Sequence, residues 1–279
     1  MKSPNIVVTF LAVSYFNSGE LPRLIQSLIG QDDARWRLLI VDNSCDSSEQ
    51  SRLTNLAEID PRIRVLISDR NYGFFPGALT HANQVENSQW VAICNSDTEL
   101  SCKDFVSRLS LVGEESSAVI APSIKESEPG LDLNPFLLRP PSQLWILLRL
   151  AGTSHSTLFR LMQKIRDART KQKAAMVDRQ SGSLDIFASH GSFMVLRADF
   201  FSTLRPKHFQ KLYGEELTIA MLVRYAKGKI TYFPSLAVRH YAHASTSSVN
   251  LDLKARLQHK ALRSFARTYR SRTWRSKHE

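Results

Sequence analysis

The sequence predicts an α/β domain with a Rossmann-like mixed sheet flanked by helices. Two observations support this fold class. Apolar, β-branched runs of strand length alternate with helical segments along the first third of the chain, which is typical of parallel strands joined by right-handed helical crossovers. The chain has 279 residues, of which 43% are hydrophobic, so it can bury the core of one large domain.

Four buried strands with helices between them are expected in this first part. The run NIVVTFLAVSY is apolar almost throughout, which indicates a strand covered on both faces. An amphipathic helix follows, with Ser18 as its candidate N-cap and with one apolar face made of Leu21, Leu24, Ile25 and Leu28. The next elements are a strand at 36–42, a polar helix at 47–59, a strand at 62–68, a Gly- and Pro-containing turn entering a helix at 71–87, and a strand at 89–94.

Regular structure is interrupted and then resumes in the second part of the chain. Residues 125–143 are rich in Pro and acidic side chains, and residues 144–176 form a helical segment that is first apolar and then basic. A strand leading into a helix is expected at 191–201. A further helix stops at Gly228 and gives way to a strand. The last segment is a basic helical tail.

The net charge of +11 is concentrated in two places. Residues 132–180 contain nine Lys and Arg against three acidic residues, and residues 251–279 contain nine against two. The excess predicts an anionic partner, and nucleic acid is not expected because no recognised binding motif accompanies the charge. An anionic membrane surface is favoured, although a mobile lid with a solvated basic face is an equal alternative. Trp145 would then enter the headgroup region, facing lipid together with Arg139, Arg149 and Arg160.

Signals of cellular location are few. The three cysteines show neither a paired framework nor CxxC spacing, which favours a reducing compartment. The opening run resembles a signal peptide but lacks a small-residue cleavage site, so we interpret it as the first buried strand. The longest other apolar stretch, LWILLRLAG, is too short to span a bilayer. We expect a cytoplasmic protein, peripheral on the inner face of the cell membrane.

Polar side chains follow four predicted strands at the point where each strand ends. A turn would explain any one of them, but in open α/β sheets ligands bind at the carboxyl ends of the strands. Their gathering on one edge therefore predicts a binding site. The four groups are Ser14-Tyr15, Asp42-Asn43-Ser44, Asp69-Arg70-Asn71 and Asn95-Ser96-Asp97.

Five stretches of the sequence are informative as a set and in their order along the chain: VSYFNSGELPRLIQSL, LIVDNSCDSSE, NYGFFPGALTHAN, VAICNSDTEL and LYGEELTIAMLVRYAKGKITYFPSLAVRHYAHAST. Each is weak alone, but together the chain resembles family 2 glycosyltransferases of the GT-A fold, especially bacterial rhamnosyltransferase-like members that build cell-surface polysaccharides. The resemblance implies a GT-A domain over 1–248 and a basic helical tail over 249–279. Within the domain it implies a nucleotide-binding half at 1–125, a basic and apolar insertion at 126–184, and an acceptor-binding half at 185–248.

The resemblance also implies a reaction. An inverting enzyme of this kind would move a sugar from a nucleotide-diphosphate donor, dTDP-rhamnose or a UDP-sugar, to a growing cell-surface glycan on a lipid carrier. Negative charge develops on the leaving phosphate, and Mg²⁺ or Mn²⁺ would stabilise it. Asp97 stands where the family has its Asp-x-Asp or Asn-x-Asp motif, so it is the expected metal ligand, with Asn95 and Ser96 beside the donor. The alternative is that Asp97 caps a helix starting near Ser101.

Further residues are placed around the nucleotide by the same resemblance. Asp42 would accept a hydrogen bond from the pyrimidine ring, unless it only forms a polar turn. Tyr15 could instead be a core aromatic, and Arg70 a solvated arginine. A glycine in the third loop would allow close backbone approach to the nucleotide. The full set is Ser14, Tyr15, Asp42, Arg70, Asn71, Gly73, Asn95, Ser96 and Asp97.

The stretch YGEELTIA stands where the family has Glu-Asp before a helix. There the second acid deprotonates the acceptor hydroxyl, which assigns the general base to Glu216. Glu is one methylene longer than Asp, so Glu215 stays a candidate. Both acids could instead do no more than favour the helix N-terminal dipole.

Two histidine-bearing segments complete the implied site. His240 matches a late family histidine that completes the metal shell in some members, and the alternative is a structural histidine. His243 is a weaker candidate for the same role. His190 and Gly191 fall on the acceptor-side strand, where Gly191 would admit close approach of the sugar.

Two other classes of function compete with this reading. A nucleotidyltransferase shares the alternating sheet and the metal carboxylate, but it usually has a Gly-rich, Lys- or Arg-bearing loop after its first strand, whereas SYFNSGE has a single Gly and no Lys or Arg. A nucleotide- or nucleic-acid-binding protein without catalysis would fit the charge and the replacement of Glu-Asp by Glu-Glu. Donor hydrolysis measured with and without metal would separate the three.

Overall fold

The computed structural model describes residues 6–85, 87–113, 117–127, 130–155, 157–160, 182–241 and 250–270. Its strands are β1 (Ile6–Ser14), β2 (Trp36–Asp42), β3 (Ile63–Ile67), β4 (Ser88–Asn95), β5 (Thr98–Leu100), β6 (Val119–Glu126), β7 (Leu184–Ile186), β8 (Phe193–Arg197) and β9 (Ile230–His240). Its α-helices are α1 (Leu21–Ile29), α2 (Ser47–Ala57), α3 (Phe74–Thr80), α4 (Phe105–Ser110), α5 (Gln143–Ser154), α7 (Ala198–Thr203), α8 (Glu215–Tyr225) and α9 (Leu251–Arg270). Two 3-10 turns are η1 (Ala82–Gln84) and η2 (Pro206–His208).

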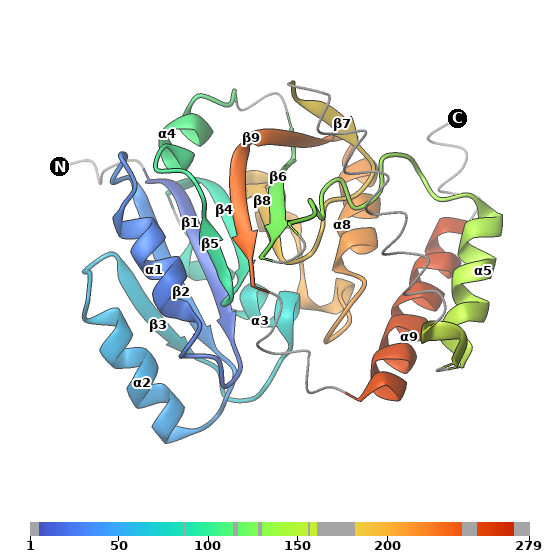
Figure 1. The fold of residues 1–279 in the computed structure, drawn as a ribbon, viewed down its shortest axis with the longest axis horizontal. Coiled ribbons are helices and arrows are strands. Elements are labelled where there is room, and N and C mark those ends of the chain that lie inside the picture. Colours follow the sequence, from blue (N-terminus) through green and yellow to red (C-terminus); the bar gives the residue numbers. More distant parts are fainter. Residues whose placement is uncertain are drawn as a thin grey trace.

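These strands form one mixed sheet in the order β3-β2-β1-β4-β8-β6-β9-β5, with β7 paired to β9 (Figure 1). The first four strands in that order are parallel, as predicted. β8 is antiparallel to both β4 and β6, and β9 is parallel to β6. The α/β fold class with a mixed sheet is therefore confirmed. The antiparallel insertion of β8 brings the residues before Phe193 to the carboxyl end of β4, where Asn95 N–H donates to Ser192 C=O over 2.9 Å.

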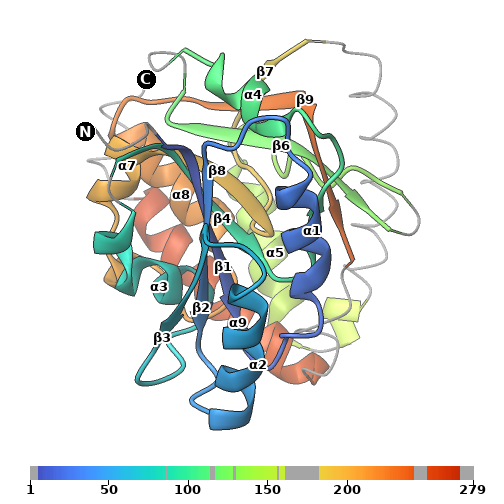
Figure 2. The ribbon, with the colours of Figure 1, turned by 90° about the vertical axis from the view of Figure 1, so that its left-hand side faces the viewer.

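Helices cover both faces of the sheet (Figure 2). Along β1, Phe10 and Ala12 point into one apolar cluster, and Leu11 and Val13 into the other, because side chains alternate along a strand. The first cluster is covered by α1, α2 and α4, and the second by α3, α7, α8 and α9. The four apolar residues predicted for α1 are fully buried, each contributing about 1.5–3 kcal/mol to burial of the core.

The predicted helix start at Ser18 is wrong. α1 begins at Leu21, and Glu20 occupies the N-cap position without a side-chain cap. A proline in the first turn sets the start of the helix instead. Ser18 donates from its backbone N–H and its hydroxyl to the buried Glu49 carboxylate of α2, over 2.8 and 2.9 Å. Ser18 therefore links the turn before α1 to helix α2 and does not cap α1.

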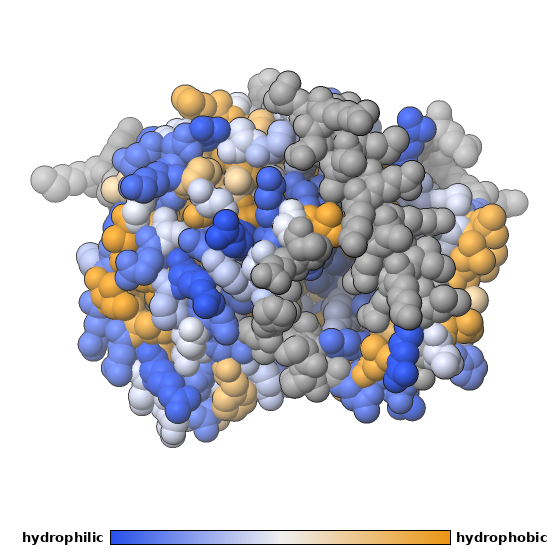
Figure 3. Space-filling model, viewed as in Figure 1, coloured by the Kyte–Doolittle hydropathy of each residue, from blue (hydrophilic) through white to orange (hydrophobic). Residues whose placement is uncertain are grey.

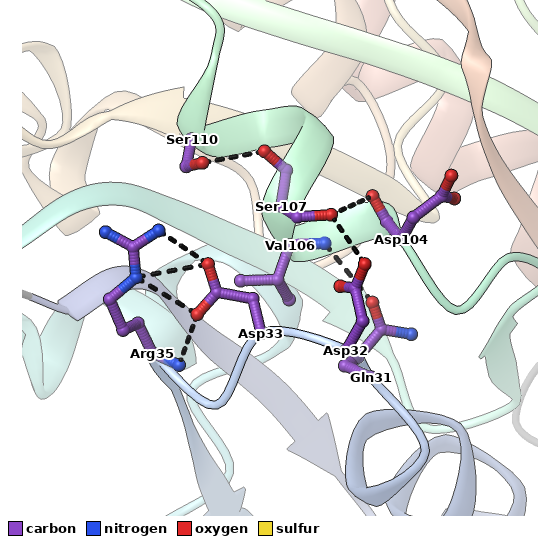
Figure 4. A network of polar contacts seen from close by, with 8 residues as sticks. All are labelled: Gln31, Asp32, Asp33, Arg35, Asp104, Val106, Ser107 and Ser110. Atoms are coloured by element: carbon purple, nitrogen blue, oxygen red, sulfur yellow. Dashed lines mark hydrogen bonds and ion pairs between the residues drawn. The ribbon is translucent and has the colours of Figure 1, made fainter.

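A polar network fixes α4 to the loop between α1 and β2 (Figure 4). Ser107 Oγ donates to Asp32 Oδ2 over 3.0 Å, and Arg35 forms an ion pair with Asp33 over 2.6 Å. The loop leads into the amino end of β2. Helix α4 is thus anchored at the edge of the sheet away from the strand ends that carry the predicted site.

Helices α5 and α9 lie side by side at one end of the molecule (Figure 1). Both were expected to be helical, and this is confirmed for 143–154 and 251–270. Thr153 Oγ1 lies 3.0 Å from His259 Nδ1 across the pair, and Leu262 and Phe265 of α9 pack into the same core cluster as α8. Within the described part of the chain, the helices are too short or too polar to cross a membrane.

Candidate active site

A cavity of about 480 Å³ opens where the carboxyl ends of β1, β2 and β4 meet the loops before β8 and α8. Helices α5 and α9 close its far side. Most of the residues predicted from the sequence are brought together here, although they come from distant segments. Those that line the cavity are Tyr15, Asn71, Gly73, Asn95, Ser96, Asp97, His190, Gly191, Glu215, Glu216 and His240.

Asp97 and His240 form the predicted ligand pair. His240 Nε2 lies 3.3 Å from Asp97 Oδ1, and both side chains are buried. The strands produce this contact: Thr98 pairs with His240 in the antiparallel β5–β9 ladder, and Tyr241 N–H donates to Asp97 C=O over 3.0 Å. The capping alternative for Asp97 is wrong, because α4 begins at Phe105 with another residue as its N-cap.

The pair has the spacing of two ligands of one cation. Mg²⁺ binds oxygen ligands at about 2.0–2.1 Å in an octahedral shell, so neighbouring ligand atoms lie about 3 Å apart. The described residues contain no group of three or more His, Cys, Asp or Glu that could hold a metal by itself. Asp97 and His240 have the spacing to supply two ligands of one cation, and the other coordination positions would be filled by groups from outside the described residues.

On the nucleotide side, Ser14, Asp42 and Arg70 do not line the cavity. Ser14 and Asp42 are neighbours across β1 and β2 and are fully buried. Asp42 Oδ1 accepts from Ser44 N–H over 2.8 Å, as the turn alternative expected, but Asp42 Oδ2 and Ser14 Oγ have no hydrogen-bond partner within the described residues. Buried oxygens without donors cost free energy, so a ligand N–H reaching Asp42 Oδ2 would be stabilising.

Tyr15 and Arg70 lie at the surface. Tyr15 is 48% exposed and meets Phe16 edge-on, so the alternative that it is a core aromatic is wrong. Arg70 is exposed, and its guanidinium lies over the Tyr72 ring at 4.7 Å from the centroid. That position agrees with the solvated-arginine alternative.

Glycine is required at position 73 for a structural reason that the sequence did not reveal. Its φ of +91° favours glycine, and a Cβ there would lie 2.0 Å from the carbonyl oxygen of Lys211. Phe74 N–H donates to the same oxygen over 3.0 Å, while Asn71 Oδ1 accepts from Gly73 N–H and Asn43 Nδ2 donates to Gly73 C=O, each over 2.8 Å. The glycine therefore joins the nucleotide-side loop to the loop that leads into α8.

Glu215 and Glu216 are the first residues of α8, after Gly214 in the left-handed conformation. Burial and the neighbouring Glu216 charge raise the pKa of Glu215 well above its ordinary value of 4.5. Burial also raises the pKa of Glu216, but backbone N–H groups, including that of Gly191, and the positive charge of Arg149 oppose the rise. The two environments differ: backbone N–H groups and Arg149 stabilise the Glu216 carboxylate, whereas the Glu216 charge destabilises a second carboxylate at Glu215.

Gly191 makes room for a side chain of the protein, whereas the sequence predicted that it would admit the sugar. A Cβ on Gly191 would lie 2.5 Å from Glu215 Oε1, so this glycine makes room for the Glu215 carboxyl. The preceding residue, His190, is fixed by two neighbours. Its backbone N–H donates to the buried Asn134 Oδ1 over 2.7 Å, and its ring nitrogen Nδ1 lies 2.9 Å from Ser192 Oγ. The His190 and His240 ring centroids are 6.4 Å apart. His243 lies outside the described residues.

One set of residues lies elsewhere than the sequence predicted. Trp145 and Arg149 were expected to face a membrane, but both line the cavity, and the Arg149 guanidinium lies over the Trp145 ring at 5.4 Å from the centroid. Arg160, which was also expected there, is exposed in the helical turn at 157–160. The spacing of Trp145, Arg149 and Thr153, four residues apart on one helical face, was the signal that could have found them.

Other lining residues were not predicted at all. Glu126 ends β6 and is the register partner of His240 in β9. Tyr213 and Lys211 come from the loop before α8, and Gln258 and Leu262 come from α9. Their signal was absent from the sequence, because only the long-range pairing of β6 with β9 and the packing of α9 bring them to the site.

Residues 9–201 match the family described as Glycosyl transferase family 2, and the chain belongs to this family. The match includes the strand ends that carry Asp42 and Asp97. It stops before Glu215, Glu216 and His240. No curated protein matches the sequence.

Several solved structures share the fold. GalNAc-T7 with UDP, GalNAc and Mn²⁺ has a TM-score of 0.62 at 13% identity, covering 90% of this chain and 46% of that chain. The mannosyltransferase PcManGT from Pyrobaculum calidifontis in complex with GDP-Man and Mn²⁺ has a TM-score of 0.54 at 14% identity, covering 94% and 68%. S. aureus TarS 1-349 in complex with UDP-GlcNAc has a TM-score of 0.54 at 12% identity, covering 88% and 61%. The chain thus spans less than half of GalNAc-T7, and at these identities the likeness shows the GT-A fold alone.

Proposed function

We propose that this protein is an inverting, metal-dependent glycosyltransferase that moves a hexose from a nucleotide-diphosphate donor to a hydroxyl of a glycan acceptor. One observation carries the proposal: the Asp97–His240 pair and the Glu215–Glu216 pair line a single cavity at the carboxyl ends of the parallel strands. Family membership supports a transferase over the two rival classes.

Asp97 and His240 would hold Mg²⁺ or Mn²⁺, and such a cation stabilises the negative charge that develops on the departing diphosphate. Mn²⁺ accompanies the nucleotide or nucleotide sugar in two of the similar structures. The ionised Glu216 takes the proton of the acceptor hydroxyl. The acceptor oxygen forms its bond to the anomeric carbon as the bond from that carbon to the diphosphate oxygen breaks, so the configuration inverts and a nucleoside diphosphate leaves.

The donor belongs to the class of nucleotide sugars. The similar structures contain UDP, GDP-Man or UDP-GlcNAc, and the rhamnosyltransferase-like sequence pattern favours dTDP-rhamnose or a UDP-sugar. We propose a growing, lipid-linked cell-surface polysaccharide, such as an O-antigen, as the acceptor. Nucleic acid is not part of this proposal.

The outward faces of α5 and α9 support attachment to an anionic membrane surface. On α5, Leu144, Leu147 and Leu148 are 65%, 49% and 60% exposed, and apolar side chains gather at this side of the molecule (Figure 3). On the adjacent α9, a basic stripe at helical spacing is exposed: Arg256, Lys260, Arg263 and Arg267. Leucines beside a basic stripe suit the boundary between acyl chains and anionic headgroups.

The proposed location is therefore peripheral, on the cytoplasmic face of the membrane. All three cysteines lie in the described residues as free thiols, which agrees with a reducing compartment. The residues that contact lipid in this proposal differ from those expected at first, because Trp145 and Arg149 point to the cavity.

A donor-cleavage assay tests the function. Purified protein is incubated with dTDP-rhamnose, UDP-sugars or GDP-mannose, with Mn²⁺ or with a chelator, and release of the nucleoside diphosphate is measured. Metal-dependent release of UDP or dTDP is expected, and Glu216→Gln should remove the acceptor-dependent part. Release of pyrophosphate from a nucleoside triphosphate and a sugar phosphate would identify a nucleotidyltransferase instead, and binding without turnover would identify a non-catalytic protein.

A further inference from the structure

Helix α5 exposes apolar side chains on its outer face, which is unusual for a helix at a protein surface. An amphipathic helix at a protein surface normally points its apolar side inward. Along α5, three leucines point outward instead, while an aromatic ring and a guanidinium line the cavity: Trp145 and Arg149. The inner face of α5 thus has two partners. Ile146 packs in the core with Trp145 and Leu150 against it, while Trp145 and Arg149 also line the cavity.

The chemistry of this face is that of a sugar-phosphate site. The Arg149 guanidinium lies over the Trp145 ring, an arrangement that orients the guanidinium by cation–π attraction. A guanidinium presents several N–H donors in a fork that matches phosphate oxygens. An indole ring offers a flat apolar surface on which the C–H face of a sugar can lie.

The position of Arg149 assigns this face to the acceptor. Arg149 lines the same cavity as Glu216, and its positive charge lowers the pKa of that carboxyl, so an anionic group bound to Arg149 would lie near the proposed base. The cavity also contains the carboxyl groups of Asp97, Glu126, Glu215 and Glu216. An anionic acceptor entering this site would be repelled unless a fixed positive charge received it.

We propose that Trp145 and Arg149 form an acceptor subsite for a phosphate-bearing glycan, with a sugar ring on Trp145 and its phosphate on Arg149. This proposal rests on the glycosyltransferase function proposed above and specifies its acceptor. The phosphate could belong to a lipid-diphosphate carrier or to a soluble glycan phosphate. The leucine face of the same helix adjoins the subsite, which suits the lipid-linked source.

Steady-state kinetics test the subsite. Arg149→Gln, Arg149→Lys and Trp145→Ala are compared with wild type on a phosphate-bearing acceptor and on its dephosphorylated analogue. Arg149→Gln should raise KM for the phosphate-bearing acceptor by about ten- to a hundredfold, the range for a hydrogen bond to a charged group, and should leave KM for the analogue and for the donor nearly unchanged. Arg149→Lys should recover part of the loss. Trp145→Ala should raise KM for both acceptors.

The two sources of phosphate are compared in the same assay. A lipid-linked glycan diphosphate is tested beside the corresponding soluble glycan phosphate. A larger effect of Arg149→Gln on the lipid-linked acceptor identifies the carrier diphosphate as the ligand, and equal effects identify any phosphate-bearing glycan. The matched control is Arg35→Gln, which removes one half-exposed arginine far from the cavity and should leave both KM values unchanged. For Arg149→Gln, an equal rise in KM for the phosphorylated and dephosphorylated acceptors, or a rise in donor KM, would overturn the proposal.

A binding measurement separates failure of the subsite from failure of the proposed function. With the donor side saturated by UDP and Mn²⁺, glucose 1-phosphate is titrated and tryptophan fluorescence is recorded for wild type, Trp145→Phe and Arg149→Gln. The expected quenching is absent in Trp145→Phe, and the affinity falls at least tenfold in Arg149→Gln. If UDP and Mn²⁺ do not bind, the proposed function fails. If they bind while glucose 1-phosphate gives the same response in all three proteins, the subsite alone is wrong.

Discussion

His240 Nε2 lies 3.3 Å from Asp97 Oδ1, although one residue ends β9 and the other follows β4. Short strand β5 makes the connection, since Thr98 pairs directly with His240. A carboxylate oxygen and an imidazole nitrogen at this distance have the spacing of two ligands of one cation. In the proposed function, a cation held by this pair at the strand ends would face the donor diphosphate.

Removal of either ligand should uncouple nucleotide binding from metal. In wild type, calorimetry should show tighter UDP binding with Mn²⁺ than after chelation. Asp97→Asn and His240→Ala should weaken the metal-dependent part at least tenfold, because each removes one of two protein ligands. The control is Asp33→Asn, which changes a carboxylate in the distant α1–β2 loop. Identical UDP affinity with and without metal in wild type would exclude the metal role.

Glu216→Gln should reduce sugar transfer by about 10²–10⁴-fold while donor affinity stays nearly constant, because a general base acts on the acceptor. Glu215→Gln should keep most of the activity. The pH profile adds a second check. The pKa of Glu216 is raised above its ordinary value, so activity should increase with pH through that raised pKa. An inactive Glu215→Gln beside an active Glu216→Gln would reverse the assignment.

The same carboxyls predict how stability depends on pH. The pKa of Glu215 is raised well above its ordinary value of 4.5 by burial and by the Glu216 charge, so the folded protein binds more protons than the unfolded chain between these two pKa values. Stability must then fall as pH rises from about 4.5 through the folded-state pKa. Glu215→Gln should reduce this fall to the share of Glu216, whose pKa is also raised, and the reduction is measured as a flatter dependence of Tm on pH. A steeper dependence in the variant would contradict the burial of this carboxyl.

Gly191→Ala should lower activity without unfolding the protein. The new Cβ would lie 2.5 Å from Glu215 Oε1, and the end of a glutamate side chain can move away. The displaced carboxyl would disturb Glu216, so we expect kcat to fall severalfold with a small change in Tm. Gly73→Ala is the contrasting variant. There the obstacle is the backbone oxygen of Lys211 at 2.0 Å and φ is +91°, so a large loss of stability is expected.

These results show which parts of the molecule a sequence can reveal. The parallel strands were predictable because each is a continuous apolar run buried on both faces, and Asp97 was predictable because its motif stands directly at a strand end. The second half was harder: β8 inserts antiparallel between β4 and β6, and no local pattern specifies such long-range pairing. Trp145 and Arg149 were misplaced for a physical reason. Which face of α5 meets the cavity depends on how the helix packs against α9 and the core, and no local pattern specifies that packing.

Binding to anionic vesicles should depend on the outward faces of α5 and α9. Deleting 251–279 is not a clean test, because Leu262 and Phe265 of α9 belong to the core. The sharper variant is Arg256→Gln with Arg263→Gln, both exposed on the basic stripe.

Each basic residue near an anionic surface contributes about 1 kcal/mol, so this double variant should bind such vesicles more weakly by up to about thirtyfold, and by less where salt screens the charges. Wild-type binding should itself weaken with salt, because the Debye length is only about 8 Å at physiological ionic strength. Leu144→Ser with Leu148→Ser should also weaken vesicle binding, and the size of this loss should not depend on the salt concentration. The charge-matched control is Arg35→Gln with Arg108→Gln, which lie beside the distant α4 network. Activity on a lipid-linked acceptor should fall with vesicle binding, while activity on a soluble acceptor should not. Equal losses on both acceptors, or equal vesicle binding by the stripe variant and its control, would show that this face does not contact the membrane.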